Sequence, residues 1–277
     1  MFKTNPEIGV LLPVYTKDKP EYLSLALESI INQSYRNFVL YVGIDGPITE
    51  DLASVIKHYD DNSRVKPVWF KENRGLAVVL NDLIVIAQNN GAEFIARMDA
   101  DDISISDRFE KQINFLKEHP DIDVVGGAIT EIDEKGESRK KDIVYPLSPE
   151  DCRKFFAKRN PHAHPAVMFR KSFFEKIGHY YRPEYRQNQD TMLWLDGFSK
   201  GTNNANIPDI ILKFRMTDAL FKKRRNGFSF AKKQFKDRLL INRTLGYNFK
   251  ADLFGFAMFC LLIAPTGIRK IAYRIFR

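Results

Sequence analysis

The stretch FIARMDADD, residues 94–102, decides the fold of this chain. Its first part, Phe94 to Met98, is short and rich in apolar residues, which indicates a buried strand. Three carboxylates, Asp99, Asp101 and Asp102, follow at once. Asp is depleted in strands, and its charge is costly to bury without a partner. The acidic triplet therefore marks the point where a buried strand ends.

These residues alone leave two interpretations of the acidic triplet open. Divalent cations such as Mg²⁺ and Mn²⁺ prefer oxygen ligands, and they often bind one or two carboxylates together with substrate phosphates. An Asp-x-Asp at the end of a strand can therefore bind a metal ion that also coordinates the oxygens of a diphosphate. Alternatively, Asp101 and Asp102 only cap a helix that begins near Ser106.

Buried strands alternate with helical patterns over the first 130 residues. Strands are expected at 8–15, 38–44, 65–70, 94–98 and 124–129, and helices at 21–33, 50–59, 75–89 and 107–118. This order predicts an α/β fold with a Rossmann-like, mostly parallel sheet and helices on both faces. Ligands of such sheets bind beyond the carboxyl ends of the strands, where Tyr15, Asp45 and Asp99 lie.

The pattern changes after residue 131. Residues 133–136 have the composition of a hairpin turn. Further elements are expected as helices at 149–158 and 191–198 and as strands at 164–169 and 207–216.

The length and the cysteine content set broad limits. With 277 residues, the chain is long enough for one large domain or two small ones. Cys152 and Cys260 are the only cysteines, which is typical of a reducing cytosol and excludes a disulfide framework. The N-terminus lacks a long apolar segment before its first strand, so a cleaved signal peptide is not expected.

The formal charge of +8 gathers in the last quarter of the chain, because Lys and Arg far outnumber Asp and Glu between residues 213 and 250. Such a block predicts an anionic partner: phosphate, nucleic acid or an acidic membrane face. A basic helical pattern covers 228–245, and the apolar run 253–264 is shorter than the roughly 20 residues that span a bilayer. With 268–277, these segments predict either an interfacial helix pair on anionic lipid or a helical hairpin packed on the domain.

Seven short stretches occur in an order that resembles one known family. They are LPVY (12–15), SIINQSY (29–35), IDG (44–46), NRGL (73–76) with LN (80–81), IARMDADD (95–102), HPAVMFR (164–170) and QDTMLW (189–194). The set resembles the family 2 glycosyltransferases, which have the GT-A fold of nucleotide-diphospho-sugar transferases. It is most similar to the bacterial branch that builds capsule, exopolysaccharide or O-antigen units. The resemblance covers about 8–218, which implies a catalytic domain at 1–218 and a basic, amphipathic C-terminal helical region at 219–277.

The resemblance implies a donor side made of several short segments. The residues expected to contact or border the nucleotide are Pro13, Val14, Tyr15, Asp45, Asn73, Arg74, Gly75 and Asp99. Asp101 matches the ligand of a divalent metal, Mn²⁺ or Mg²⁺. Arg215 is interpreted either as a contact to the diphosphate or as a surface arginine.

The resemblance also implies an acceptor side. Asp190 matches the catalytic base, although a helix cap would also explain an Asp at this position. Gln189 stands where the family usually has Glu. His164 and Trp194 are expected on the same side, with simple packing as the alternative for His164.

Together these expectations describe an inverting, metal-dependent, non-processive glycosyltransferase. It would move one sugar from a nucleotide-diphospho-sugar, expected to be a UDP-sugar, to a hydroxyl of a lipid-linked saccharide. The location would be the cytoplasmic, inner face of the cell membrane, without contact to nucleic acid. A sugar-phosphate nucleotidyltransferase is disfavoured because residues 16–20 lack a glycine-rich phosphate loop, and a nucleic-acid-binding protein because no zinc or RNP-type motif occurs.

Overall fold

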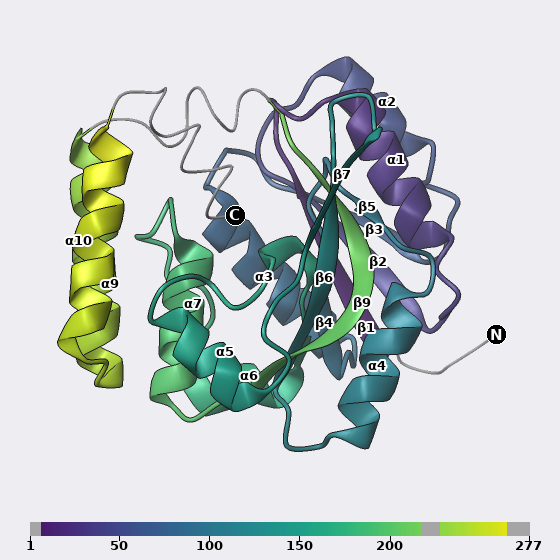
Figure 1. Ribbon diagram of the computed structural model, residues 1–277. Coiled ribbons are helices and arrows are strands. Elements are labelled where there is room, and N and C mark those ends of the chain that lie inside the picture. Colours follow the sequence, from purple (N-terminus) through teal and green to yellow (C-terminus); the bar gives the residue numbers. More distant parts are fainter. Residues whose placement is uncertain (1–6, 218–227, 265–277) are drawn as a thin grey trace.

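A sheet of nine strands with helices on both faces forms the centre of the molecule (Figure 1). The computed structural model describes residues 7–217 and 228–264. Along the sheet the strands follow the order β3-β2-β1-β4-β8-β6-β9-β5, and β7 pairs with β6. The expected α/β fold is therefore confirmed.

The first half of the sheet is parallel. It consists of β1 (Ile8–Val14), β2 (Phe38–Ile44), β3 (Val65–Trp69) and β4 (Phe94–Arg97). The helices α1 (Pro20–Ile31), α2 (Glu50–Lys57) and α3 (Leu76–Asn89) connect them. Strands β1 and β2 are almost wholly buried because helices cover both faces, which explains their uninterrupted apolar sequence.

The second half of the sheet is mixed. After β5 (Ile103–Ser104) and α4 (Arg108–Glu118), the chain forms β6 (Val124–Ile132), β7 (Ser138–Ile143), β8 (Met168–Arg170) and β9 (Asn204–Arg215). Strand β8 is antiparallel to both β4 and β6, whereas β6 and β9 are parallel. Strand β5 pairs with β9 at the end of the sheet order, so the chain passes from β4 to the edge beside β9 directly after the acidic triplet.

The structure of the segment 164–177 differs from the sequence prediction in two ways. The expected strand 164–169 begins instead with a 3-10 turn, η1 (His164–Ala166), and only Met168–Arg170 pairs in the sheet. Pro165 has no N–H to give to a strand ladder, which fits this change. The helix α6 (Lys171–Ile177) was not expected.

Two hydrophobic cores lie on opposite faces of the sheet. One core packs α1, α2 and α4 against the sheet, with Leu27, Leu52 and Phe109 as examples. The other packs α3, α5 (Pro149–Phe156), α6 and α7 (Gln189–Ser199) against the opposite face, which is visible in Figure 1.

The C-terminal helices α9 (Phe228–Leu245) and α10 (Phe249–Ile263) lie side by side at the edge of the molecule (Figure 1). Helix α9 packs on α7, and its Ile241 is fully buried in the second core. Arg238 Nη1 also donates to the carbonyl of Phe156 at 2.5 Å. None of the helices among the described residues has both the length and the apolar character to cross a membrane. The segment 268–277 lies outside the described residues.

Candidate active site

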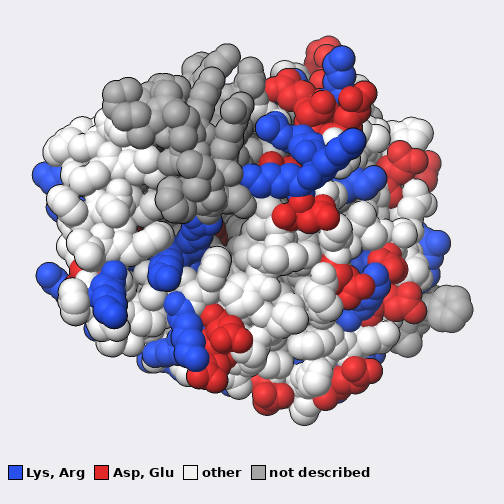
Figure 2. Space-filling view, viewed as in Figure 1, with Lys and Arg blue, Asp and Glu red and all other residues white. Residues whose placement is uncertain are grey.

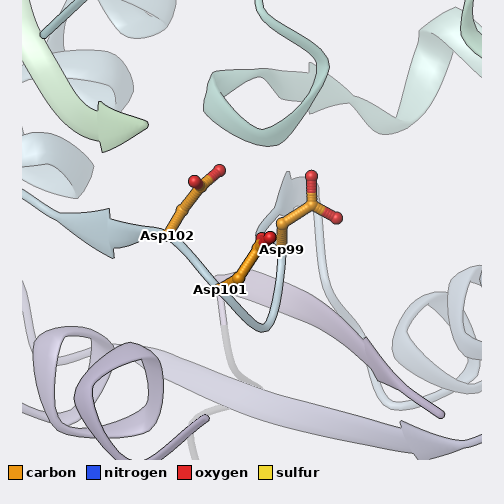
Figure 3. A group of neighbouring side chains, drawn as sticks. All are labelled: Asp99, Asp101 and Asp102. Atoms are coloured by element: carbon orange, nitrogen blue, oxygen red, sulfur yellow. The ribbon is translucent and has the colours of Figure 1, made fainter. Parts of the chain in front are cut away.

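Three carboxylates meet in the loop between β4 and β5. Asp99, Asp101 and Asp102 each offer one oxygen, and these oxygens lie within 4.8 Å of one another. Figure 3 shows that the three side chains point to the same side of this loop. They lie beyond the carboxyl end of a parallel strand, as the sequence predicted.

The charges of this carboxylate cluster are only partly balanced. Arg97, which is buried, forms an ion pair with Asp99. Burial, followed by the nearby charge of Asp99, raises the pKa of Asp101 to about 6. Burial and the charges of Asp101 and Asp99 also raise the pKa of Asp102 well above its usual value. A group of carboxylates under such mutual repulsion favours the binding of a cation.

Asp102 supplies a test of whether a divalent cation fits. Its Oδ1 accepts the backbone N–H of Arg215 at 2.8 Å. Its Oδ2 is buried and has no hydrogen-bond partner within the described part of the chain. A buried carboxylate oxygen without a donor is costly, and a hard cation is the ligand that such an oxygen fits. The residues present therefore fit a divalent metal.

The helix-capping interpretation of the acidic triplet is wrong for Asp102. Helix α4 begins at Arg108, with Asp107 at its N-cap position. The amide of Phe109, in the first turn of α4, donates to Gln33 Oε1 at 3.1 Å. The carboxylate of Asp102 is instead bound to β9.

The interpretation of Arg215 as a surface arginine is wrong, because the residue is only 1% exposed. Arg215 Nε donates to the carbonyl of Asp101 at 2.8 Å, and Nη1 donates to the carbonyls of Asp133 and Glu134. The guanidinium also lies over the ring of Tyr22, 4.2 Å from its centroid. Arg215 thus fixes the backbone that carries the carboxylate cluster.

The expected donor-side segments lie together at the ends of β1 and β2. The backbone N–H of Asp45 donates to the carbonyl of Val14 at 2.8 Å, next to Pro13 and Tyr15. The carboxylate of Asp45 accepts the N–H of Arg74 at 2.7 Å and the N–H of Gly75 at 2.9 Å.

The loop 73–75 is closed by further contacts. Asn73 Nδ2 donates to the carbonyl of Asp45 at 3.2 Å. Gly75 has a φ of 91°, which only glycine adopts without strain. Arg74 forms an ion pair with Asp82 and stacks on Phe70. The carboxylate of Asp45 therefore holds the backbone of this loop in place. The side chain of Val14 is buried, and its carbonyl accepts the N–H of Asp45.

Asp190 lies in the first turn of α7, together with Gln189. Asn160 Nδ2 donates to Asp190 Oδ2 at 2.9 Å. The positive end of the helix dipole favours a carboxylate at this position. Asn160 was not identified from the sequence, where it stands in an irregular segment thirty residues away.

Tyr181 is a buried residue that interacts electrostatically with both Asp99 and Asp190. Its hydroxyl lies 2.7 Å from His164 Nε2, and only 3% of the residue is exposed. The pKa of Tyr181 is raised, chiefly by burial; Arg97 opposes the rise, while the charges of Asp190 and Asp99 add to it. Its hydroxyl is therefore within electrostatic reach of both carboxylates. No motif marked Tyr181 in the sequence.

The two remaining residues expected on the acceptor side, His164 and Trp194, differ in their burial. His164 is half-buried and contacts Tyr181, and burial together with the charge of Arg97 lowers the pKa of its imidazole well below the usual value. Trp194 is fully buried and stacks on Phe169. The expectation that the side chain of Trp194 faces an acceptor is wrong, because no part of it is accessible.

The fold and the carboxylate cluster together fit a glycosyltransferase. The family model "Glycosyl transferase family 2" matches residues 9–178. The chain belongs to this family, and it is a glycosyltransferase with the GT-A fold. The two alternatives, a sugar-phosphate nucleotidyltransferase and a nucleic-acid-binding protein, are thereby set aside.

The chain is similar to two curated bacterial proteins. It is 36% identical over 226 residues to the amylovoran biosynthesis glycosyltransferase AmsE of Erwinia amylovora, which covers 82% of each chain. It is 29% identical over 275 residues to UDP-Gal:alpha-D-GlcNAc-diphosphoundecaprenol beta-1,3-galactosyltransferase of Escherichia coli, covering 99% of this chain and 98% of that protein.

A similar solved structure is that of S. aureus TarS 1-349 in complex with UDP-GlcNAc. The TM-score is 0.65 at 14% sequence identity, covering 96% of this chain and 83% of the other. At this identity the similarity supports the fold alone.

Proposed function

We propose that this glycosyltransferase transfers one sugar, with inversion, from a UDP-sugar to a hydroxyl of a lipid-linked saccharide in surface polysaccharide biosynthesis. The observation that carries the proposal is the carboxylate cluster beyond β4, whose oxygens lie within 4.8 Å of one another and in which Asp102 Oδ2 has no hydrogen-bond partner among the described residues. A donor held at this cluster and an acceptor held beside Asp190 would meet near Tyr181, which interacts electrostatically with Asp99 and Asp190.

The relatives support the choice of substrates. The name of the Escherichia coli relative specifies a UDP-sugar donor and an acceptor sugar on diphosphoundecaprenol. The Erwinia relative is named for the biosynthesis of amylovoran. The loop 73–75, organised by Asp45, offers the nucleotide a site at the ends of β1 and β2.

A divalent cation, Mn²⁺ or Mg²⁺, would absorb the negative charge that develops on the departing nucleoside diphosphate. Asp101 and Asp102 would hold it, and the strongest support is that Asp102 Oδ2 has no hydrogen-bond partner in the part of the chain that the structure describes. Asp99 is oriented by Arg97 and would contribute a ligand or contact the donor.

Asp190 would act as the general base. One of its oxygens is held by Asn160 Nδ2, so the carboxylate has a defined direction. It would accept the proton of the acceptor hydroxyl while that oxygen attacks the anomeric carbon of the donor. Direct displacement with a single base inverts the configuration at that carbon.

A panel of nucleotide sugars tests the proposal. Each UDP-sugar would be incubated with the full chain, Mn²⁺ and synthetic N-acetylglucosamine-diphosphate-lipid or monosaccharide-diphosphate-lipid acceptors, and UDP release and product linkage would be measured. We expect one UDP-sugar to be turned over with inversion and only with a divalent cation. Sugar transfer that retains the configuration at the anomeric carbon would refute the proposed mechanism. Full activity in excess chelator would also refute it.

The C-terminal hairpin of α9 and α10 supports a membrane-bound acceptor. Helix α10 leaves an apolar stripe open to solvent: Phe249 is 73% exposed, Leu253 62% and Phe256 50%. These positions are one turn apart and therefore share one face. The neighbouring α9 exposes Lys232, Lys236 and Arg243.

Apolar and basic side chains therefore occur together on this edge of the molecule. In Figure 2 the side of the molecule where Figure 1 draws α9 and α10 is mostly uncharged, with Lys and Arg near its border. Such a combination fits an anionic lipid surface, where apolar side chains insert and basic ones meet the headgroups. The proposed location is the inner face of the cell membrane.

A further inference from the structure

The segment that leads into Asp190 is held from two sides. On one side is α3. Asn81 Nδ2 donates to the carbonyl of Tyr181, and Asn81 Oδ1 accepts the N–H of Tyr181, both at 2.8 Å. The hydroxyl of Tyr180 donates to Gln88 Oε1 at 2.9 Å. The catalytic domain itself therefore fixes the start of this segment.

On the other side is the C-terminal helix α9. Asn188 Nδ2 donates to Asp237 Oδ2 at 3.0 Å, and Gln234 Nε2 donates to Asn188 Oδ1 at 2.7 Å. The ammonium of Lys233 lies over the ring of Tyr185, 5.2 Å from its centroid. The three α9 residues belong to one turn of the helix, so a single surface of α9 holds the end of the segment.

Asn188 occupies a special backbone position. It has a φ of 62°, in the left-handed region, and it stands at the N-cap of α7, two residues before Asp190. An Asn at an N-cap usually accepts an amide of the first helical turn with its side chain. In the described structure Asn188 makes no such bond, because both ends of its amide are bound to α9.

We propose that α9 is a positioning element for the catalytic base. Gln234 and Asp237 hold Asn188, which fixes the first turn of α7 and with it the direction of the Asp190 carboxylate. This inference rests on the proposed role of Asp190 as the base. The C-terminal hairpin is then a part of the catalytic unit. Contact of α9 and α10 with a membrane would affect the position of the Asp190 carboxylate through Asn188.

Variants of the full chain test this link without removing α9. Asp237→Ala removes the acceptor for Asn188, whereas Asp237→Asn keeps an oxygen that can accept the same bond. Asn188→Gly keeps the left-handed backbone accessible but removes the side chain. Thr244→Ala is the matched control, because Thr244 is an exposed residue of α9 that the proposal does not involve. The affinity for UDP with Mn²⁺ and the donor KM report on the donor side.

We expect Asp237→Ala and Asn188→Gly to lower kcat by about 10²-fold, the loss typical of a misplaced catalytic group. The affinity for UDP and the donor KM should stay within a factor of about two, since these contacts lie on the acceptor side. Asp237→Asn should restore most of the lost kcat. Hydrogen exchange of the amides at 188–192 should become faster in the two impaired variants.

Three results would overturn the inference: wild-type kcat in both impaired variants, an equal loss in Asp237→Asn, or a parallel loss of UDP affinity. If Asp237→Ala does not fold, as judged by thermal unfolding, Asn188→Gly decides alone, because it leaves α9 intact. Asp190→Asn is measured alongside. Its full activity would overturn both the base and the link to α9, whereas an inactive Asp190→Asn with fully active Asp237→Ala and Asn188→Gly would overturn only the link.

Discussion

Asp102 serves two purposes with its two carboxylate oxygens. One oxygen accepts the amide of Arg215 and so ties the end of β9 to the loop between β4 and β5. The other oxygen faces the carboxylate cluster without a partner among the described residues. The acidic triplet was visible in the sequence, but its link to Arg215 spans 113 residues and no local pattern indicates it. This is why no sequence pattern showed that Arg215 is buried.

The variant Asp101→Asn tests the metal assignment at the level of one residue. It keeps the size of the side chain but removes the charge, so we expect weaker binding of Mn²⁺ and near-complete loss of transfer. The protein should be no less stable, because the charge of Asp101 is disfavoured by burial and by Asp99. Calorimetry with Mn²⁺ and UDP measures the binding, and Asp121→Asn on the exposed surface is the control. Unchanged Mn²⁺ affinity would refute the assignment.

His162 gives the stability a predictable dependence on pH. Its imidazole is buried, with Nδ1 2.8 Å from Asn206 Oδ1, and burial lowers its pKa from 6.5 to about 4. Between these values the unfolded chain binds a proton that the folded chain does not bind. The contribution of His162 is therefore complete above pH 6.5 and is lost as the pH falls to about 4.

We expect the loss over this range to be on the order of 3 kcal/mol of unfolding free energy, since each pKa unit corresponds to about 1.4 kcal/mol. Denaturant unfolding at several pH values measures it. The pH slope should be smaller in His162→Asn, whatever the absolute stability of that variant. His58→Gln, at an exposed position, should keep the slope of the wild type. An identical slope in His162→Asn would contradict the prediction.

At the scale of whole elements, Gln33 joins α1, β5 and α4. It is fully buried, and its Nε2 donates to Ser29 O, Ser104 Oγ and Ile105 O, while its Oε1 accepts the amide of Phe109. Because β5 directly follows Asp102, these bonds also fix one end of the loop that carries the carboxylate cluster.

We expect Gln33→Ala to lower the unfolding free energy by about 1–3 kcal/mol, the range for leaving a buried polar group without its partner. Mn²⁺ binding should also weaken, because the loop after β4 loses a support. The control is Asn32→Ala at the neighbouring exposed position. Denaturant unfolding and Mn²⁺ calorimetry measure the two effects. A variant as stable as the wild type would contradict this role of Gln33.

The elements differ in how well the sequence predicts them. Strands β1 and β2 were predicted to within one residue, because an apolar run buried on both faces has no polar interruption. Helix α6, from Lys171 to Ile177, is too short for a helical period to stand out. The contacts of Tyr181 and Asn188 depend on helices far away in the chain, so the sequence contained no signal for them.

At the scale of the whole molecule, α9 and α10 differ in how much they are buried against the rest of the described chain. The sequence left a membrane-facing helix pair and a packed hairpin open, and the structure has features of both. Helix α9 buries Ile241 against the catalytic core, and Asn242 Nδ2 donates to Asp252 Oδ1 of α10 at 2.7 Å. Helix α10 buries only Ala251 and Gly255. The hairpin is therefore anchored through α9, whereas α10 exposes Phe249, Leu253 and Phe256.

Charges placed on this apolar face test membrane binding. A Leu or Phe side chain contributes about 1.5–3 kcal/mol when it is fully buried, so the double variant Leu253→Glu/Phe256→Glu should bind phosphatidylglycerol vesicles about 10²-fold more weakly. The wild type should be only partly released by high salt, because salt screens the basic side chains but not the inserted apolar ones. The matched control is Val144→Glu/Leu147→Glu, which charges two exposed apolar positions far from the hairpin in sequence. Vesicle sedimentation at low and high salt measures the binding. If both double variants bind as the wild type does, α10 does not contact the membrane, and its apolar face must serve another partner.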